Sequence, residues 1–160
     1  MSDLPRLNGI IAALEQGLPA FASFMDPDPG SAISFANTAY DGVVIEMEHN
    51  PFDVANLREA LYFLLDRRRI ATSGSVAPRP TPIVRIPPNG GEMNQFCAKQ
   101  VLDTGAYGVV WPHISDADQA YNAVAACRYP RPEGSPNYEP EGIRGDGPAR
   151  AARYWGVTQK

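Results

Sequence analysis

The sequence predicts an α/β fold with a parallel sheet, and three observations support this prediction. Apolar runs typical of buried strands alternate with amphipathic helical patterns along the chain. The clearest strand, residues 42–46 (GVVIE), is β-branched and apolar enough to be covered on both faces. The chain holds four such strand and helix units, which right-handed crossovers would join into one sheet. An open doubly wound sheet and half of a (β/α)₈ barrel explain this pattern about equally well. A closed barrel usually needs about 250 residues, so this chain is too short to close one alone.

Length and composition are those of one soluble domain. The chain has 160 residues, of which 44% are hydrophobic and 20% are charged. It contains no apolar run long enough to cross a bilayer, and its first residues do not resemble a secretory signal, so we expect a cytoplasmic protein without a membrane partner. The net charge of -4 argues against a nucleic-acid partner. The one tight basic run, residues 67–69, is interpreted as solvating the end of a helix.

The first half of the chain is expected to form three helices around two strands. In order, these are a helix over 4–16, a strand over 19–24, a helix over 31–39, the strand over 42–46 and a helix over 51–68. The first helix is expected to cover an open barrel end or to contact a neighbour. Asn50 is the expected cap of the last helix and Pro51 its first residue.

The second half repeats the alternation. It predicts a strand over 81–86, a helix over 92–103, a strand over 108–112, a helix capped by Ser115 and Asp118, and a short helix over 148–154. Residues 129–147 carry four prolines and four glycines, which is typical of a long loop. Cys97 and Cys127 match no metal-ligand spacing and are interpreted as reduced core thiols.

Acid-base chemistry gathers where the predicted strands end. Glu46, Glu48 and His49 follow one strand, and Arg85 lies near the carboxyl end of the next. Parallel α/β folds bind ligands at this end of their strands. From the residues alone, however, a bond to backbone is the commoner role for a strand-end histidine such as His49, and Arg85 is as well explained by an ion pair with Glu46 or Glu48.

Five blocks in a fixed order carry a family resemblance. They are EMEHNPFD, IVRIP, KQVLDTGAYGVVWPHISDADQA, RYPRPEG and GIRGDGPARAARYWG. Together they resemble the HpcH/HpaI aldolase family, metal-dependent lyases that cleave 4-hydroxy-2-oxo acids to pyruvate and an aldehyde. The resemblance implies a TIM barrel. Residues 1–160 would form its first half as a single partial domain, ending before strands five to eight.

The resemblance also implies roles for particular residues. His49 corresponds to the catalytic histidine, Asp103 to its paired aspartate, and Arg85 to the arginine that holds pyruvate. Glu48 is expected to contact the catalytic residues rather than the substrate. His113 stands where relatives carry an apolar residue, and it would either touch substrate or pack against the strand end, with packing favoured. From the residues alone, Asp103 would be a solvated helix end, although a carboxylate there opposes the helix dipole and calls for a cationic partner.

The implied activity is that of a carbon-carbon lyase with a divalent cofactor of the Mg²⁺ or Mn²⁺ type. The family's metal ligands follow the fifth and sixth strands, so they are expected beyond residue 160 and none within this chain. By itself the chain would then bind metal poorly and be weakly active or inactive. The alternatives are a lyase of the citrate lyase β or malyl-CoA type that acts on CoA esters, and a non-catalytic half-barrel that assembles with a partner. Unclosed strand edges predict a homo-oligomer in each case.

Overall fold

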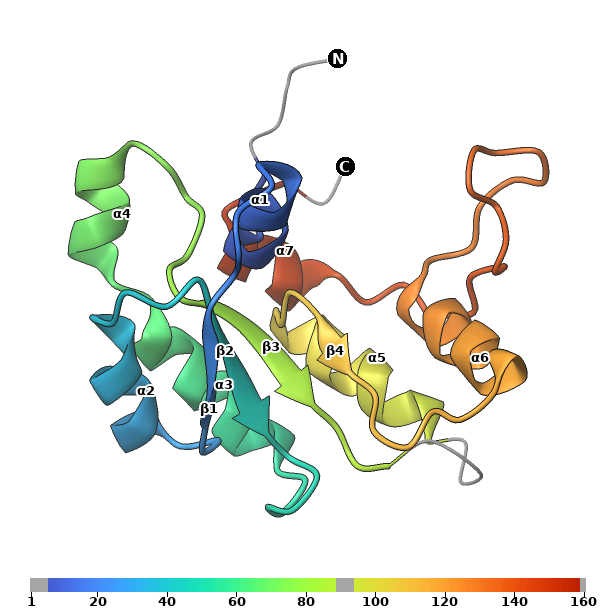
Figure 1. Cartoon of the computed structure of the whole chain (residues 1–160), viewed down its shortest axis with the longest axis horizontal. Coiled ribbons are helices and arrows are strands. Elements are labelled where there is room, and N and C mark those ends of the chain that lie inside the picture. The colour runs from blue at the N-terminus through green and yellow to red at the C-terminus, as the bar shows by residue number, and fades with distance from the viewer. Residues whose placement is uncertain (1–5, 89–93, 159–160) are drawn as a thin grey trace.

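The centre of the molecule is a sheet of four parallel strands, seen in a computed structural model that describes residues 6–88 and 94–158 (Figure 1). The strands are β1 (Ala22–Met25), β2 (Gly42–Glu46), β3 (Thr81–Arg85) and β4 (Val109–Val110). Each strand pairs with the one before it in the chain, in the order β1-β2-β3-β4. A doubly wound sheet reverses its strand order at a switch point, whereas the successive strands of a barrel follow one another in this way. The predicted parallel α/β fold is therefore confirmed, and its strand order is that of a barrel.

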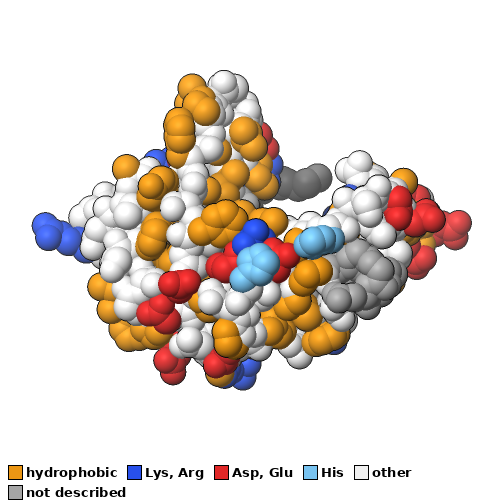
Figure 2. All heavy atoms as spheres, turned by 60° about the horizontal axis from the view of Figure 1, so that its bottom comes forward, with side chains coloured by type: hydrophobic (Ala, Val, Ile, Leu, Met, Phe, Trp, Pro, Cys, Tyr) orange, Lys and Arg blue, Asp and Glu red, His pale blue; other side chains and the backbone are white. Residues whose placement is uncertain are grey.

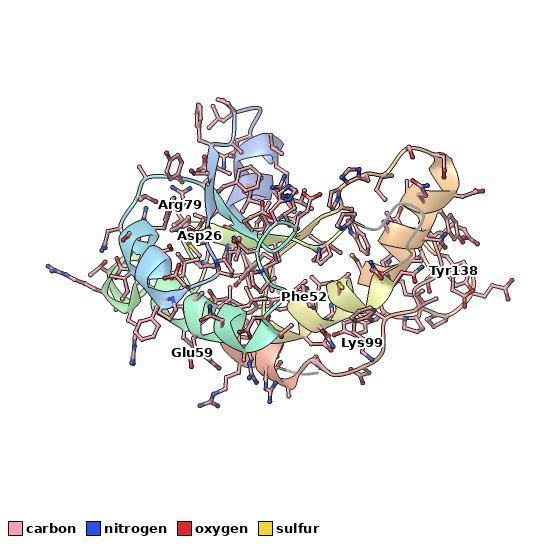
Figure 3. All side chains as sticks on the ribbon, turned by 90° about the horizontal axis from the view of Figure 1, so that it is seen from below. Asp26, Phe52, Glu59, Arg79, Lys99 and Tyr138 are labelled. Carbon is pink, nitrogen blue, oxygen red and sulfur yellow. The ribbon has the colours of Figure 1, made fainter. Side chains whose placement is uncertain are left out.

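One helix precedes the first strand, and the others follow the strands along the chain. They are α1 (Gly9–Glu15), α2 (Pro29–Ala36), α3 (Val54–Leu64), α4 (Arg67–Ser73), α5 (Gln95–Thr104), α6 (Ala117–Cys127) and α7 (Ala149–Trp155). Seen from below, α2, α3 and α5 follow one another in a single layer beneath the sheet (Figure 3). None of the helices in the part of the chain described here is long and apolar enough to cross a membrane.

The strand register separates a covered face of the sheet from an open one. Met25, Ile45 and Val84 align across three strands and are buried against the helices, where Leu57 and Leu61 of α3 complete the core. The residues on either side of these three point to the opposite face of the sheet, because side chains alternate along a strand. On that side lies Phe24, which is 54% exposed. In a closed barrel this second face is the packed interior.

Helix α1 covers the amino end of the sheet. The amide of Gly9 donates a hydrogen bond of 2.9 Å to the hydroxyl of Thr81, the first residue of β3. The Ile10 side chain fills the space in front of Gly42, where a side chain on residue 42 would collide with it. The expectation that this helix covers a barrel end is confirmed.

The helix expected over 51–68 is instead two helices with separate caps. The carboxylate of Asp53 accepts hydrogen bonds from the amides of Ala55 and Asn56, so α3 begins after residue 53 rather than at Pro51. Asp66 then caps α4 by accepting from the amide of Arg69. A second capping residue starts a new helix axis, and apolar periodicity does not reveal this break.

Three expectations for the second half also change. Strand β4 has only two residues, and Asp116 rather than Ser115 caps α6, because its carboxylate accepts from the amide of Gln119. Phe96 is 59% exposed although its helical spacing predicts burial. Cys97 and Cys127 are free thiols, as predicted, and burial raises the pKa of each.

Candidate active site

Five polar side chains meet at the carboxyl ends of β2, β3 and β4. We call this group the rim cluster, and its members are Glu46, Glu48, His49, Arg85 and His113. Figure 2 looks onto this end of the molecule, where the two imidazoles lie beside acidic and basic side chains near the centre of the face. The predicted gathering of chemistry at this edge of the sheet is present.

Glu46 fixes the backbone at the end of β2. Its partner in the strand register is Arg85, and the two side chains form an ion pair. The other carboxylate oxygen, Oε1, accepts hydrogen bonds from the amide of Glu48 at 2.7 Å and from that of His49 at 3.1 Å. Burial acts to raise the pKa of Glu46, but the guanidinium and the two amides outweigh it, so this pKa lies below its ordinary value. Glu46 therefore holds the turn that presents Glu48 and His49.

Glu48 is the carboxylate that the rest of the rim cluster shares. Its side chain is only 5% exposed. The Oε2 atom lies 3.1 Å from Nε of Arg85 and 3.6 Å from Nε2 of His49, and the Oε1 atom lies 3.3 Å from Nε2 of His113. A buried carboxylate needs cationic or hydrogen-bonding partners to remain charged. Glu48 has three groups of this kind around it, from three different strands.

Arg85 is held between the sheet and the two glutamates. Its guanidinium carbon lies 4.6 Å from the centre of the Phe24 ring, which keeps the planar group flat against the open face. Although Nε approaches Glu48, it is buried without an aligned hydrogen bond. The side chain is still 25% exposed, so its fork remains accessible to an anionic ligand.

Both imidazoles of the rim cluster face solvent. The side chains of His49 and His113 are 74% and 68% exposed. His113 has a φ of 61°, a left-handed conformation that is uncommon for a residue with a side chain. The favoured expectation that His113 packs against the strand end is wrong, because its imidazole instead reaches Glu48. In the sequence, only the polar side chain of His113 at a strand end indicated a functional residue. The turn after β4 decides that this side chain faces Glu48.

Asp103 does not join the rim cluster. It lies in the last turn of α5, which runs back from the carboxyl end of β3 to the amino end of β4. Its carboxylate accepts from Arg144, with Nη2 at 2.7 Å and Nε at 3.3 Å from Oδ1. The expected partnership with His49 is thus corrected to one with Arg144, because α5 carries Asp103 away from the rim. A catalytic role for Asp103 stays a prediction.

Arg144 is the residue that sequence reasoning did not connect to Asp103. Its side chain is 5% exposed, and its guanidinium lies 4.5 Å from the centre of the Tyr129 ring. We call Asp103 and Arg144 the loop anchor, because their ion pair ties the end of the long loop to α5. The acidic end of α5 did predict a cationic partner, but not which residue would supply it.

A metal centre would need several hard oxygen or nitrogen ligands around one point. Within residues 6–88 and 94–158, no group of three or more His, Cys, Asp or Glu side chains is arranged to hold a metal ion. The carboxylates of Glu46 and Glu48 are both directed at Arg85. The residues described do not fit a divalent cation.

Several curated proteins named as aldolases resemble this chain in sequence. The chain is 30% identical over 153 residues to 5-keto-4-deoxy-D-glucarate aldolase of Escherichia fergusonii, which covers 96% of this chain and 50% of the relative. It is 33% identical over 142 residues to hydroxypyruvate/pyruvate aldolase of Roseobacter denitrificans, covering 88% of this chain and 46% of the relative. The chain thus spans about half the length of the curated relatives it matches.

Solved structures match over the same half. An HpcH/HpaI aldolase/citrate lyase family protein from Burkholderia cenocepacia superposes with a TM-score of 0.63 and 27% identity, covering 84% of this chain and 48% of that one. The HpcH/HpaI aldolase of Desulfitobacterium hafniense shares the fold, with a TM-score of 0.64 at 18% identity over 91% of this chain and 48% of that one. The strands and helices are therefore those of the first half of a TIM barrel. The HpcH/HpaI aldolase/citrate lyase model matches residues 27–140, and the chain belongs to that family.

Proposed function

We propose that this chain supplies the acid-base and anion-holding residues of an aldolase that cleaves a 4-hydroxy-2-oxo acid to pyruvate and an aldehyde. One observation carries the proposal: the buried carboxylate of Glu48 is shared by Arg85 and two exposed imidazoles at the carboxyl rim of the strands. The names of the curated relatives support it, since they include 4-hydroxy-2-oxo-heptane-1,7-dioate aldolase of Salmonella paratyphi B, 34% identical over 151 residues.

His49 is the proposed base. Its Nε2 atom faces Glu48, and a neighbouring carboxylate favours the N–H on the facing nitrogen, which leaves Nδ1 free to accept a proton. Nδ1 takes the proton of the C4 hydroxyl, and the C3–C4 bond breaks. The C4 carbon leaves as the aldehyde, and the bonding electron pair stays on the pyruvate fragment as an enolate. Protonation of that enolate at C3 gives pyruvate.

Arg85 is the proposed holder of the anionic fragment. The substrate carboxylate is negative throughout, and the enolate adds charge as the bond breaks, so a fixed guanidinium stabilises the transition state more than the substrate. The Phe24 ring and the two glutamates fix the plane of Arg85 beforehand. His113 faces Glu48 from the far side and is proposed to contact the part of the substrate that leaves as the aldehyde.

A divalent cation of the Mg²⁺ or Mn²⁺ type belongs to the proposed reaction through the family. Such an ion would supply Lewis-acid chemistry if it were bound beside these residues. The described residues form no metal-binding site, so the ligands of this ion are proposed to come from outside this chain. The roles proposed for His49 and Arg85 rest on the contacts of these two side chains and do not depend on the metal ion.

The test is release of pyruvate from a 4-hydroxy-2-oxo acid with Mg²⁺ or Mn²⁺ present. It is measured for the chain alone and for a chimera in which the chain replaces the matching half of the Escherichia fergusonii relative. We expect activity in the chimera, a fall of about a hundredfold for His49→Ala and at least about tenfold for Arg85→Lys. Arg58→Lys on α3 is the matched control and should change nothing. A folded chimera without activity, or activity that survives both rim substitutions, would contradict the proposal.

We also infer that the chain associates with a second copy. In the described part of the chain β1 and β4 each have an unpaired edge, and the open face of the sheet exposes Phe24. Sedimentation velocity should show a dimer or larger species that dissociates on dilution. Phe24→Lys should shift that equilibrium toward the monomer, whereas a monomer at all concentrations would contradict the inference.

A further inference from the structure

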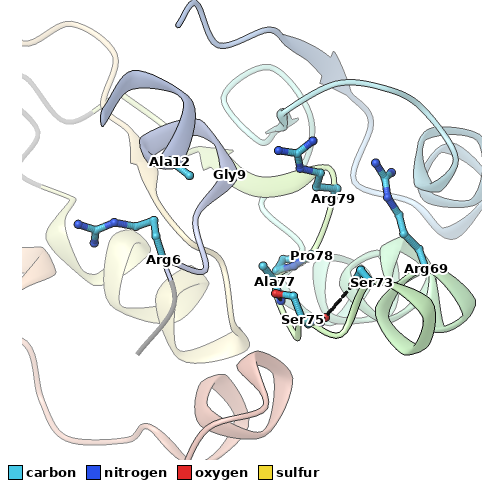
Figure 4. Close-up of a pocket in the computed structure, with 9 residues that line it drawn as sticks. All are labelled: Arg6, Gly9, Ala12, Arg69, Ser73, Ser75, Ala77, Pro78 and Arg79. Atoms are coloured by element: carbon cyan, nitrogen blue, oxygen red, sulfur yellow. Dashed lines mark hydrogen bonds between the residues drawn. The ribbon is translucent and has the colours of Figure 1, made fainter. Parts of the chain in front are cut away.

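A hollow of about 230 Å³ lies at the opposite end of the molecule from the rim cluster. Its walls come from α1, from α4 and from the segment that leads into β3 (Figure 4). Three arginines line it, namely Arg6, Arg69 and Arg79. Among the described residues that line the hollow there is no Asp or Glu. In a chain with a net charge of -4, this is a local concentration of positive charge.

The three arginines differ in how much of their charge is already used. Arg6 forms an ion pair with Glu15, and Figure 4 shows its side chain turned away from the other two. Arg69 donates to the carbonyl of Thr38 through Nη1 at 3.3 Å, and its other N–H groups have no partner among the described residues. Arg79 is exposed and has no ion-pair or hydrogen-bond partner within residues 6–88 and 94–158. Two guanidinium groups from different elements thus remain available on one side of the hollow.

Ser73 and Ser75 line the other side of the hollow (Figure 4). The hydroxyl of Ser73 donates to backbone carbonyls of its own turn. The Ser75 oxygen accepts from the amide of Ala77, and no acceptor for its own hydrogen lies in the described part of the chain. In Figure 4 the guanidinium groups of Arg69 and Arg79 lie on one side of the hollow and Ser75 on the other, so a small ligand between the two arginines would meet two forks.

We propose that this hollow binds a small phosphate-bearing anion, with Arg69 and Arg79 as its cationic clamp. A phosphate group presents several strong acceptor oxygens around one compact centre, so it can satisfy two forks together. A single carboxylate has only two oxygens and fits one fork. The basic run at residues 67–69, interpreted from sequence as a solvated helix end, thereby gains a role for Arg69. The site is remote from Glu48, so it does not depend on the proposed aldolase activity.

Calorimetric titration of the intact chain with pyrophosphate and with inorganic phosphate tests the site. Titration with citrate at matched ionic strength is the comparison with a carboxylate ligand. We expect saturable binding of pyrophosphate that is tighter than binding of citrate. Arg79→Gln should weaken it by about tenfold or more, the effect of losing one charge-assisted contact. Arg67→Gln removes a charge from the same basic run but does not line the hollow, and it should leave the dissociation constant within about twofold.

Arg69→Gln gives a second measure and is accompanied by circular dichroism, because Arg69 also bonds to Thr38. Arg79 has no such structural contact, so its substitution stays informative if Arg69→Gln fails to fold. The proposal is overturned if no anion binds saturably, if citrate binds as tightly as pyrophosphate, or if Arg67→Gln weakens binding as much as Arg79→Gln.

Discussion

The rim cluster and the loop anchor are made of the same groups, an arginine against carboxylates, and they differ in what remains unused. In the loop anchor, Asp103 and Arg144 satisfy each other, and the arginine side chain is 5% exposed. In the rim cluster the carboxylate of Glu48 is equally buried, but the imidazoles around it are 74% and 68% exposed. The first arrangement is closed, whereas the second offers its charge to solvent and to ligands.

This difference separates residues that hold the fold from residues suited to chemistry. A closed pair contributes mainly by avoiding an unpaired buried charge. An open cluster keeps charged and basic groups in a fixed arrangement without saturating them, which is what proton transfer and anion binding need. Substitutions in the rim cluster should therefore change activity, and those in the loop anchor should change stability.

The largest expected effect follows from removing the shared carboxylate. Glu48→Gln keeps the shape of the side chain but loses the charge that orients both imidazoles and Arg85. We expect kcat of the chimera to fall about a hundredfold. Steady-state pyruvate release measures it, with Glu59→Gln on the outer side of α3 as the control. An unchanged kcat would remove Glu48 from the proposed site.

A substitution in the loop anchor should lower the free energy of unfolding. Asp103→Asn leaves the buried Arg144 guanidinium without its counter-charge, so the free energy of unfolding should fall by about 2 to 4 kcal/mol. Urea unfolding followed by circular dichroism measures this, and Asp118→Asn on the exposed first turn of α6 is the control. If Asp103→Asn instead abolished activity at unchanged stability, the catalytic role that the family resemblance gives Asp103 would be supported and the contrast with the rim cluster would fail.

A smaller effect is expected at the second imidazole. His113→Asn removes the ring while retaining a residue type that tolerates a positive φ, so it separates chemistry from backbone strain. We expect kcat/KM of the chimera to fall about threefold to tenfold, the loss of one polar contact. An equal loss in His113→Gly and full activity in His113→Asn would show that only the turn matters.

The smallest expected effect is the contribution of Glu46 to the pH dependence of stability. Its pKa in the folded chain lies below the ordinary value of 4.5, so the unfolded chain takes up the proton first as the pH falls. The stability that Glu46 contributes is therefore complete above that ordinary pKa and is lost as the pH drops through the folded-state value. Unfolding free energies measured between about pH 6 and pH 3 should fall less steeply for Glu46→Gln. Parallel slopes in the two proteins would contradict this assignment.

Much of the fold followed from local pattern. The strand over 42–46 was predicted with its observed bounds because its short apolar run is rich in β-branched residues, which favours a strand over a helix. The break between α3 and α4 was missed because both helices share an apolar period, and only the Asp66 cap marks the change of axis. Phe96 was expected inside for the same reason, since period alone does not say which face of a helix the sheet will cover.

For the candidate site, the sequence alone determined which groups would stand at the ends of the strands, because parallel strands place their carboxyl ends at a common edge. Only the tertiary structure decided which of them meet. Glu48 became the shared carboxylate, and Asp103 found Arg144 rather than His49, because the chain carries α5 back to the amino end of the sheet and folds the distant loop over it. Contacts between residues far apart in sequence depend on how the elements pack, and no local pattern encodes that distance.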